Sequence, residues 1–190
     1  MNSIKTVKPL KEFEGIKLKN FGRRPTTIND IKGLLSLLRN SEGNFLEIGT
    51  WWGKSTYELA TRFPKKTFYT IDFLDIQLEY ECAMTTRASK EDLCKYAKDL
   101  PNVKFEYIES CKFDYNGKNI RTVFVDGDHG YIGVKKDTEL ALKNLPKGGI
   151  IAWHDSLQHR FAVPKYLETE IDTKYKRYLF ENSQVSYIVL

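Results

Sequence analysis

Short apolar runs separated by connections of helix length constrain the fold of this chain more than any other feature. Strands are expected at 44–48, 67–71, 103–108, 122–125 and 150–153. Connections of that length are typical of parallel strands, because antiparallel strands can be joined by a short turn. We therefore predict an α/β fold, with a doubly wound, mostly parallel sheet of the Rossmann-like type and helices on both of its faces.

The segments between and after these strands refine the prediction. Thr27 is a favourable N-cap residue and Asp30 suits the first turn of the helix that would follow. Further helices are expected at 54–63, 131–145 and, for the most part, 76–100. Two strand-like runs at 176–180 and 185–189 are separated by four residues, which predicts a C-terminal antiparallel hairpin.

Length and composition indicate one globular domain. The chain has 190 residues, of which 41% are hydrophobic and 29% charged. We expect a single domain over 25–190 and an irregular polar arm over 1–24 that could cover the site. Three cysteines without metal-type spacing indicate a reducing compartment, and no apolar run of about 18 residues is present. We therefore predict a cytoplasmic protein without a membrane partner.

The charge pattern bears on the partners. The formal net charge is +5, but the basic residues are interspersed with acidic ones along the chain. A nucleic-acid-binding face would concentrate lysine and arginine in one stripe. We expect a small-molecule partner rather than a nucleic acid, and the sequence is also compatible with a homodimer.

A glycine-containing loop at 47–55 connects the first of these expected strands to a helix. A phosphate-binding loop would have four residues between its glycine and the Gly-Lys-Ser end, and three separate Gly49 from Gly53. A dinucleotide-binding loop would have glycine where this chain has Trp51. The loop is then either a tight turn without a ligand or a binding site for another cofactor.

An acidic residue and an aromatic residue follow the second strand. Asp72 is placed to accept hydrogen bonds from two ribose hydroxyls of a nucleoside cofactor. Phe73 could pack on an adenine ring or in the core.

Acidic residues and histidines follow the fourth and fifth strands. Asp126, Asp128 and His129 come after one, and His154 and Asp155 come after the other. The carboxyl ends of parallel strands share one edge of the sheet, so these side chains should converge. Crowded carboxylates need a cation or a proton between them, and Mg²⁺ would suit Asp126 and Asp155. A hydrogen-bonded network without metal is the alternative.

These segments together resemble the methyltransferase 24 family of class I S-adenosylmethionine-dependent methyltransferases, related to macrocin-type O-methyltransferases and cephalosporin-hydroxylase-like proteins. The resemblance rests on 47–55, Asp72, 123–131, Asp137 and 146–155. It implies S-adenosylmethionine as cofactor, with contacts from Glu47, Gly49, Thr50, Trp51, Gly53, Ser55, Asp72, Phe73, Ser110 and Asp126.

The resemblance also implies an activity, which is methylation of a small-molecule hydroxyl with assistance from Mg²⁺. Catalytic roles would fall to His129 as base and to Asp126, and the metal ligands would be Asp126, His154 and Asp155. The chain departs from cation-dependent relatives at His154, where they have an acid. Two alternatives stay open: a metal-dependent hydrolase or hydroxylase-like enzyme, and a non-catalytic nucleic-acid-associated protein.

The sequence does not identify the acceptor. Its pocket would be built from 1–24, 76–100 and 158–160, where Arg23, Arg24 and Arg160 could bind an anionic acceptor.

Overall fold

The computed structural model describes residues 4–22, 26–73 and 89–190 and contains one eight-stranded sheet in the order β1-β7-β8-β6-β5-β2-β3-β4. Strands β2 to β6 are parallel, whereas β8 is antiparallel to both β6 and β7. The predicted mostly parallel sheet with a C-terminal antiparallel hairpin is confirmed. The strands are β1 (Lys5–Val7), β2 (Asn44–Ile48), β3 (Phe68–Asp72), β4 (Val103–Tyr107), β5 (Ile120–Val125), β6 (Ile150–Trp153), β7 (Tyr178–Phe180) and β8 (Ser186–Val189).

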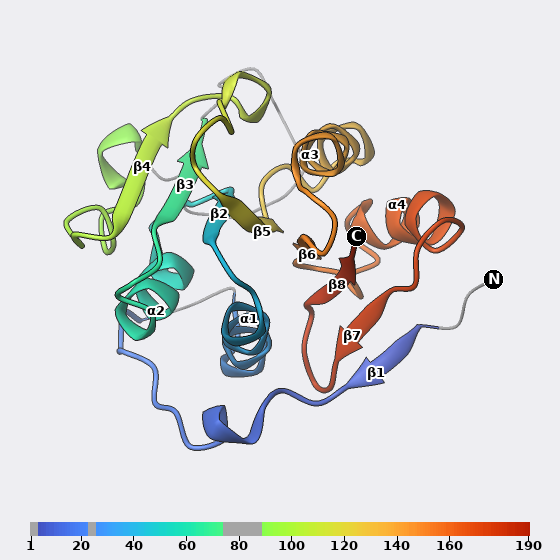
Figure 1. Ribbon diagram of the computed structural model, residues 1–190, viewed down its shortest axis with the longest axis horizontal. Coiled ribbons are helices and arrows are strands. Elements are labelled where there is room, and N and C mark those ends of the chain that lie inside the picture. Colours follow the sequence, from blue (N-terminus) through green and yellow to red (C-terminus); the bar gives the residue numbers. More distant parts are fainter. Residues whose placement is uncertain (1–3, 23–25, 74–88) are drawn as a thin grey trace.

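Helices cover both faces of this sheet. Figure 1 shows α1 and α2 on one side and α3 and α4 on the other. Each side has its own apolar core, and residues of alternating strand positions point into one or the other. Within the described ranges, no helix is long and apolar enough to cross a membrane. The helices are α1 (Ile28–Asn40), α2 (Lys54–Arg62), α3 (Tyr131–Asn144) and α4 (Val163–Tyr166), which continues as a π-helical turn over Leu167–Ile171.

Helix α1 begins where the sequence predicts. The Thr27 hydroxyl accepts a hydrogen bond from the backbone N–H of Asp30, and the Asp30 carboxylate accepts one from the backbone N–H of Thr27 at 2.7 Å. This capping box satisfies two donors at the start of the helix, which have no partner within the helix itself.

The sheet reverses its strand order between β2 and β5. From β2 the chain adds β3 and β4 on one side and then returns to place β5 on the other side. Gly49 follows β2 with a φ of 93°, and a Cβ atom there would collide with the backbone carbonyl of Asp126. Glycine therefore lets the loop after β2 lie directly on the backbone at the end of β5.

The segment before β4 differs from the expected helix over 76–100. Residues 74–88 lie outside the described ranges, and the chain from 89 onwards forms a 3₁₀ turn at Lys90–Asp92 and a series of further turns. The backbone N–H of Cys94 donates to the carbonyl of Trp51 at 2.7 Å, and that of Tyr96 donates to the carbonyl of Trp52. These two hydrogen bonds hold the segment against the glycine loop. The backbone N–H groups of Cys94 and Tyr96, which a helix would bond internally, are thus used in contacts with the loop.

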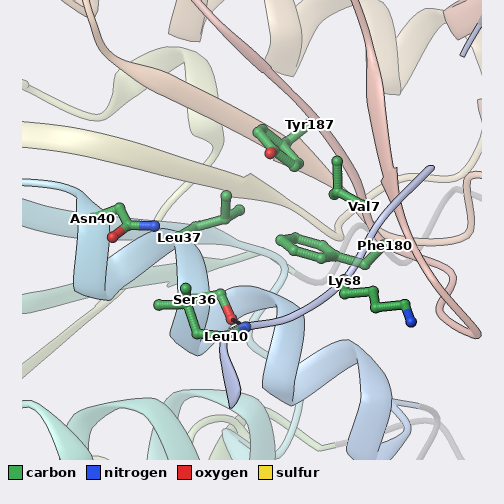
Figure 2. Close-up of a pocket in the computed structure, with 8 residues that line it drawn as sticks. All are labelled: Val7, Lys8, Leu10, Ser36, Leu37, Asn40, Phe180 and Tyr187. Atoms are coloured by element: carbon green, nitrogen blue, oxygen red, sulfur yellow. Dashed lines mark hydrogen bonds between the residues drawn. The ribbon is translucent and has the colours of Figure 1, made fainter. Parts of the chain in front are cut away.

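The N-terminal segment is more regular than the predicted arm. Its strand β1 extends the sheet beside β7, and the chain then runs past α1 towards α2 (Figure 1). Figure 2 shows the shallow pocket where this segment meets α1, β7 and β8, and there the Leu10 backbone N–H donates to the Ser36 hydroxyl at 2.8 Å. The segment is thus tied to the domain. This pocket lies away from the strand ends that carry the predicted site.

We predict that Gly49→Ala destabilises the protein by about 2–4 kcal/mol, because the added methyl group meets backbone and the φ angle is unfavourable for alanine. Gly117→Ala is the control, since Gly117 also has a positive φ of 69° but has open space around it. Urea unfolding should give a loss of only about 1 kcal/mol for the control. Equal losses in the two variants would contradict the proposed packing of Gly49 on Asp126.

Candidate active site

The carboxyl group of Glu47 lies beneath the glycine loop. Glu47 is 1% exposed, and its Oε2 accepts hydrogen bonds from the hydroxyls of Thr56 and Thr70. Burial is the largest influence on this group and raises its pKa to about 8, although the two hydroxyls oppose the shift. Glu47 is therefore mostly protonated at neutral pH, so that a cation entering the loop would meet a carboxyl group able to ionise.

The loop itself is held against the end of β3. Trp51 has a φ of 45°, and its backbone N–H donates to Oδ2 of Asp72 at 2.6 Å. The Thr50 hydroxyl bonds the hydroxyl of Thr70 and the carbonyl of Ile71. Burial raises the pKa of Asp72, with the Trp51 N–H opposing it. The glycine loop and Asp72, both predicted from the sequence, are therefore in contact through the backbone N–H of Trp51.

Helix α2 begins at the far end of the loop. Gly53 is its N-cap with a φ of 74°, and the Ser55 hydroxyl in its first turn bonds the hydroxyl of Thr26 at 3.0 Å. Trp51 and Trp52 stack with their ring centroids 4.5 Å apart. Among the described residues, the buried Nε1 of Trp52 has no hydrogen-bond partner. The loop therefore contains a donor that a ligand could satisfy.

Two residues of the predicted cofactor set lie further along the same edge of the sheet. Phe73 is 43% exposed and packs against Tyr107, so it is not a core residue. Ser110 follows β4, and its hydroxyl donates to the carboxylate of Asp137 on α3. Burial raises the pKa of Asp137 to about 6, which the Ser110 hydroxyl opposes.

Four of the predicted residues at the ends of β5 and β6 converge. Nε2 of His129 lies 2.9 Å from Oδ2 of Asp155 and 4.0 Å from Oδ1 of Asp126. Nδ1 of His154 lies 3.1 Å from the same Asp155 oxygen and 3.4 Å from Oδ1 of Asp126. Asp155 reaches this position from a left-handed backbone conformation with a φ of 52°. We call Asp126, His129, His154 and Asp155 the rim cluster.

The third carboxylate beside this cluster is Asp30 and not Asp128. The side chain of Asp128 turns back and accepts from the backbone N–H of Gly130 at 2.8 Å. Asp30 is fully buried, with its Oδ2 3.4 Å from Nε2 of His154. The sequence indicated Asp30 only as a helix-capping residue, and no local signal connects it to a histidine 124 positions later.

The charges of the rim cluster are strongly coupled. Burial raises the pKa of Asp126 to about 6, against the effect of the two histidines. Burial alone would also raise the pKa values of Asp155 and Asp30, but their histidine and hydroxyl partners lower both, that of Asp30 to about 2. Burial would lower the pKa values of His129 and His154, yet the neighbouring carboxylates raise them. The cluster thus favours positive charge between carboxylates.

The solvent side of the cluster is bordered by aromatic surface. His129 keeps 30% of its side chain exposed, and its ring lies 4.4 Å from that of Phe161, centroid to centroid. The guanidinium of Arg160 lies 4.6 Å from the Phe161 ring centroid. Arg160 therefore packs on the aromatic residue beside His129, while Arg23 and Arg24 lie outside the described residues.

The glycine loop and the rim cluster both lie in a stretch of the chain that matches a known protein family. The methyltransferase 24 family, described as a methyltransferase domain, matches residues 46–156, which is more than half of the chain. No curated protein matches the chain in sequence.

Solved O-methyltransferases share the fold. NovP is 13% identical, with 85% of this chain and 79% of that chain covered and a TM-score of 0.63. TomG from Streptomyces achromogenes, solved with SAM, is 17% identical over 82% and 76% of the two chains, with a TM-score of 0.56. An O-methyltransferase from Bacillus cereus in complex with SAH is 15% identical over 91% and 84%, with a TM-score of 0.57. At these identities the likeness is one of fold.

We predict that Glu47→Gln gains stability relative to the unaltered protein as the pH rises. The folded protein holds the Glu47 proton up to about pH 8, whereas the unfolded chain releases it near 4.5. The stability of the unaltered protein should therefore fall between these values, by up to about 1.4 kcal/mol for each pH unit. Glutamine does not titrate, so the variant lacks this loss.

Urea unfolding at pH 5 and pH 8 measures the effect, with Glu139→Gln on the exposed face of α3 as the control. The stability difference between Glu47→Gln and the unaltered protein should grow from pH 5 to pH 8, while Glu139→Gln should show no such trend. A difference that is constant across this range would show that Glu47 is ionised in the fold.

Proposed function

This chain belongs to the methyltransferase 24 family, and on that premise we propose that it transfers a methyl group from S-adenosylmethionine to a hydroxyl of a small molecule. The observation that carries the proposal is the contact between Gly49 and the backbone of Asp126. This contact joins the glycine loop to the rim cluster at the point where the strand order of the sheet reverses. Open α/β folds bind their ligands at such a point.

The residues of the loop fit the proposed cofactor. S-Adenosylmethionine carries an ammonium group on its amino-acid end and a ribose, and the loop has the carboxyl groups of Glu47 and Asp72 at its two sides. Trp52 adds a buried donor without a partner among the described residues. The proposed contacts are Glu47, Gly49, Thr50, Trp51, Gly53, Ser55, Asp72, Phe73, Ser110 and Asp126.

Two of these contacts would require an exchange of partners. The hydroxyl of Ser55 bonds Thr26, and that of Ser110 bonds Asp137. Such exchanges need only side-chain rotations, which are common on binding. Asp72 already accepts from the backbone N–H of Trp51 at 2.6 Å, and backbone N–H groups of Phe73 and Thr50 also lower its pKa.

The rim cluster also fits a divalent cation. Asp126, His154 and Asp155 offer one ligand atom each, and these atoms lie within 4.8 Å of one another. A cation held by these residues would lower the pKa of an acceptor hydroxyl. The family resemblance implies Mg²⁺ in this role.

The protein's contribution to the reaction is positioning and proton transfer. Bound S-adenosylmethionine supplies the methyl group, whose bond to sulfur breaks as its bond to the acceptor oxygen forms, leaving a thioether. His129 takes the proton of the acceptor hydroxyl on Nδ1, because its Nε2 lies 2.9 Å from the Asp155 carboxylate and donates its own hydrogen there. The negative charge of Asp126 and Asp155 also favours the imidazolium that results.

Two other functions have distinct signatures. A metal-dependent hydrolase or hydroxylase-like enzyme built on the same rim would lose its activity with a chelator and would be indifferent to S-adenosylmethionine. A nucleic-acid-associated protein would bind with a steep dependence on salt.

We predict that S-adenosylhomocysteine binds the protein and that Asp72→Asn weakens this binding at least tenfold, because the amide loses acceptor strength towards the ribose. Asp99→Asn, a change of the same kind at an exposed position, should leave the affinity unaltered. Isothermal titration calorimetry measures both. Absence of binding at millimolar ligand would refute the proposed cofactor.

We predict that His129→Ala lowers kcat by roughly 10²–10⁴-fold while the affinity for S-adenosylhomocysteine stays within about threefold of the unaltered protein. The lost group removes a proton and does not hold the cofactor. Glu139→Gln on α3, where the Glu139 side chain is 60% exposed, provides the control. Turnover is followed as S-adenosylhomocysteine released from a panel of phenolic and sugar hydroxyl acceptors, and an unchanged kcat would exclude His129 as the base.

A further inference from the structure

Asp30 is a buried carboxylate whose two oxygens are held by fixed donors. Oδ2 accepts from the backbone N–H and the hydroxyl of Thr27, both at 2.7 Å. Oδ1 accepts from the hydroxyl of Ser183 and the backbone N–H of Gln184, both at 2.7 Å. Asp30 thereby joins the start of α1 to the turn between β7 and β8. Towards any further neighbour it acts as an acceptor.

That further neighbour is His154. Its Nε2 lies 3.4 Å from Oδ2 of Asp30, so Nε2 carries the hydrogen and donates it. A neutral imidazole then has its lone pair on Nδ1. Because His154 is only 5% exposed and is held by Asp30 on one side, the direction of that lone pair is fixed by the fold.

The lone pair faces two carboxylates. Nδ1 of His154 lies 3.1 Å from Asp155 and 3.4 Å from Asp126. Two ligands bound at about 2.1 Å to one ion lie roughly 3.0–3.4 Å apart. Three electron-pair donors at these separations repel one another unless a cation or a proton lies among them. Proteins commonly orient a metal-binding imidazole in this way, with a carboxylate bonded to the ring nitrogen that does not bind the metal.

We propose that Asp30 is a positioning residue that directs Nδ1 of His154 towards a divalent cation shared with Asp126 and Asp155, and that this nitrogen ligand makes the site select a transition metal ion over Mg²⁺. Imidazole suits transition metals, whereas Mg²⁺ prefers an all-oxygen shell with several waters. This inference rests on the proposed cation site and extends it by naming the class of ion and the residue behind His154.

Manganese(II) is the probe, because its electron paramagnetic resonance signal reports both binding and the ligand type. We expect Mn²⁺ to bind at least tenfold more tightly than Mg²⁺, with electron spin-echo modulation from a coordinated imidazole nitrogen. His154→Asp should abolish that modulation and bring the two affinities closer together. Absence of Mn²⁺ binding, equal affinities or a spectrum without nitrogen coupling would each overturn the proposal. The first of these would indicate that a protonated His154 neutralises the carboxylates instead.

Asp30→Asn tests the positioning role. The amide can present its NH₂ group to Nε2 and so allow the other tautomer, and we expect Mn²⁺ affinity to fall 10–100-fold. Ser183→Ala removes a different hydrogen bond from the same carboxylate, and it should alter Mn²⁺ affinity by less than about threefold even if it lowers stability comparably. Equal effects of the two variants on Mn²⁺ affinity would show that Asp30 acts only through the fold. If Asp30→Asn fails to fold, the Mn²⁺ spectrum of the unaltered protein still tests the nitrogen ligand.

Calorimetry with S-adenosylhomocysteine on the same samples separates the two proposals. Cofactor binding without preferential Mn²⁺ binding overturns the metal inference and leaves the proposed methyl transfer standing. Mn²⁺ binding with a nitrogen ligand but without S-adenosylhomocysteine binding supports the metal site and refutes the proposed cofactor.

Discussion

The close approach of Gly49 to the backbone of Asp126 is the constraint on which the rest of the site depends. At this point β2 and β5 end side by side and the strand order reverses, so loops from both halves of the sheet meet. A side chain at position 49 would separate them. With glycine there, the loop lies directly on the end of β5, and Glu47 is close enough to Asp126 for their charges to interact. The proposed transfer of a group between two bound molecules would need such closeness.

Burial of charge divides the site into two parts. Under the loop, two hydroxyls hold Glu47 and no cation of the described residues does, and its pKa rises to about 8. At the rim, Asp155 and Asp30 have histidine partners, and their pKa values fall. The Glu47 carboxyl group therefore holds a proton at neutral pH, whereas the rim cluster favours positive charge on its histidines.

Strands β2 to β8, the start of α1 at Thr27 and the hairpin were predictable from sequence, because each depends on a local pattern, whereas β1 was not predicted. The convergence of the rim cluster followed from the predicted parallel sheet. The helix expected up to residue 100 was wrong over its described part, because Cys94 and Tyr96 give their backbone donors to the glycine loop. Asp128 was expected at the rim, yet it bonds its own turn. Asp30 was missed as a neighbour of His154, because that contact joins residues 124 positions apart and exists only once the sheet is formed.

The loop and the rim cluster are proposed to act together in transferring a methyl group from S-adenosylmethionine to a hydroxyl. Incubation with S-adenosylmethionine carrying a ¹³C-labelled methyl group, followed by mass spectrometry of both products, tests this most directly. We predict a labelled methyl ether on an acceptor and S-adenosylhomocysteine in equal amounts. Failure to form S-adenosylhomocysteine with any hydroxyl acceptor, or its formation without a labelled product, would contradict the proposed transfer.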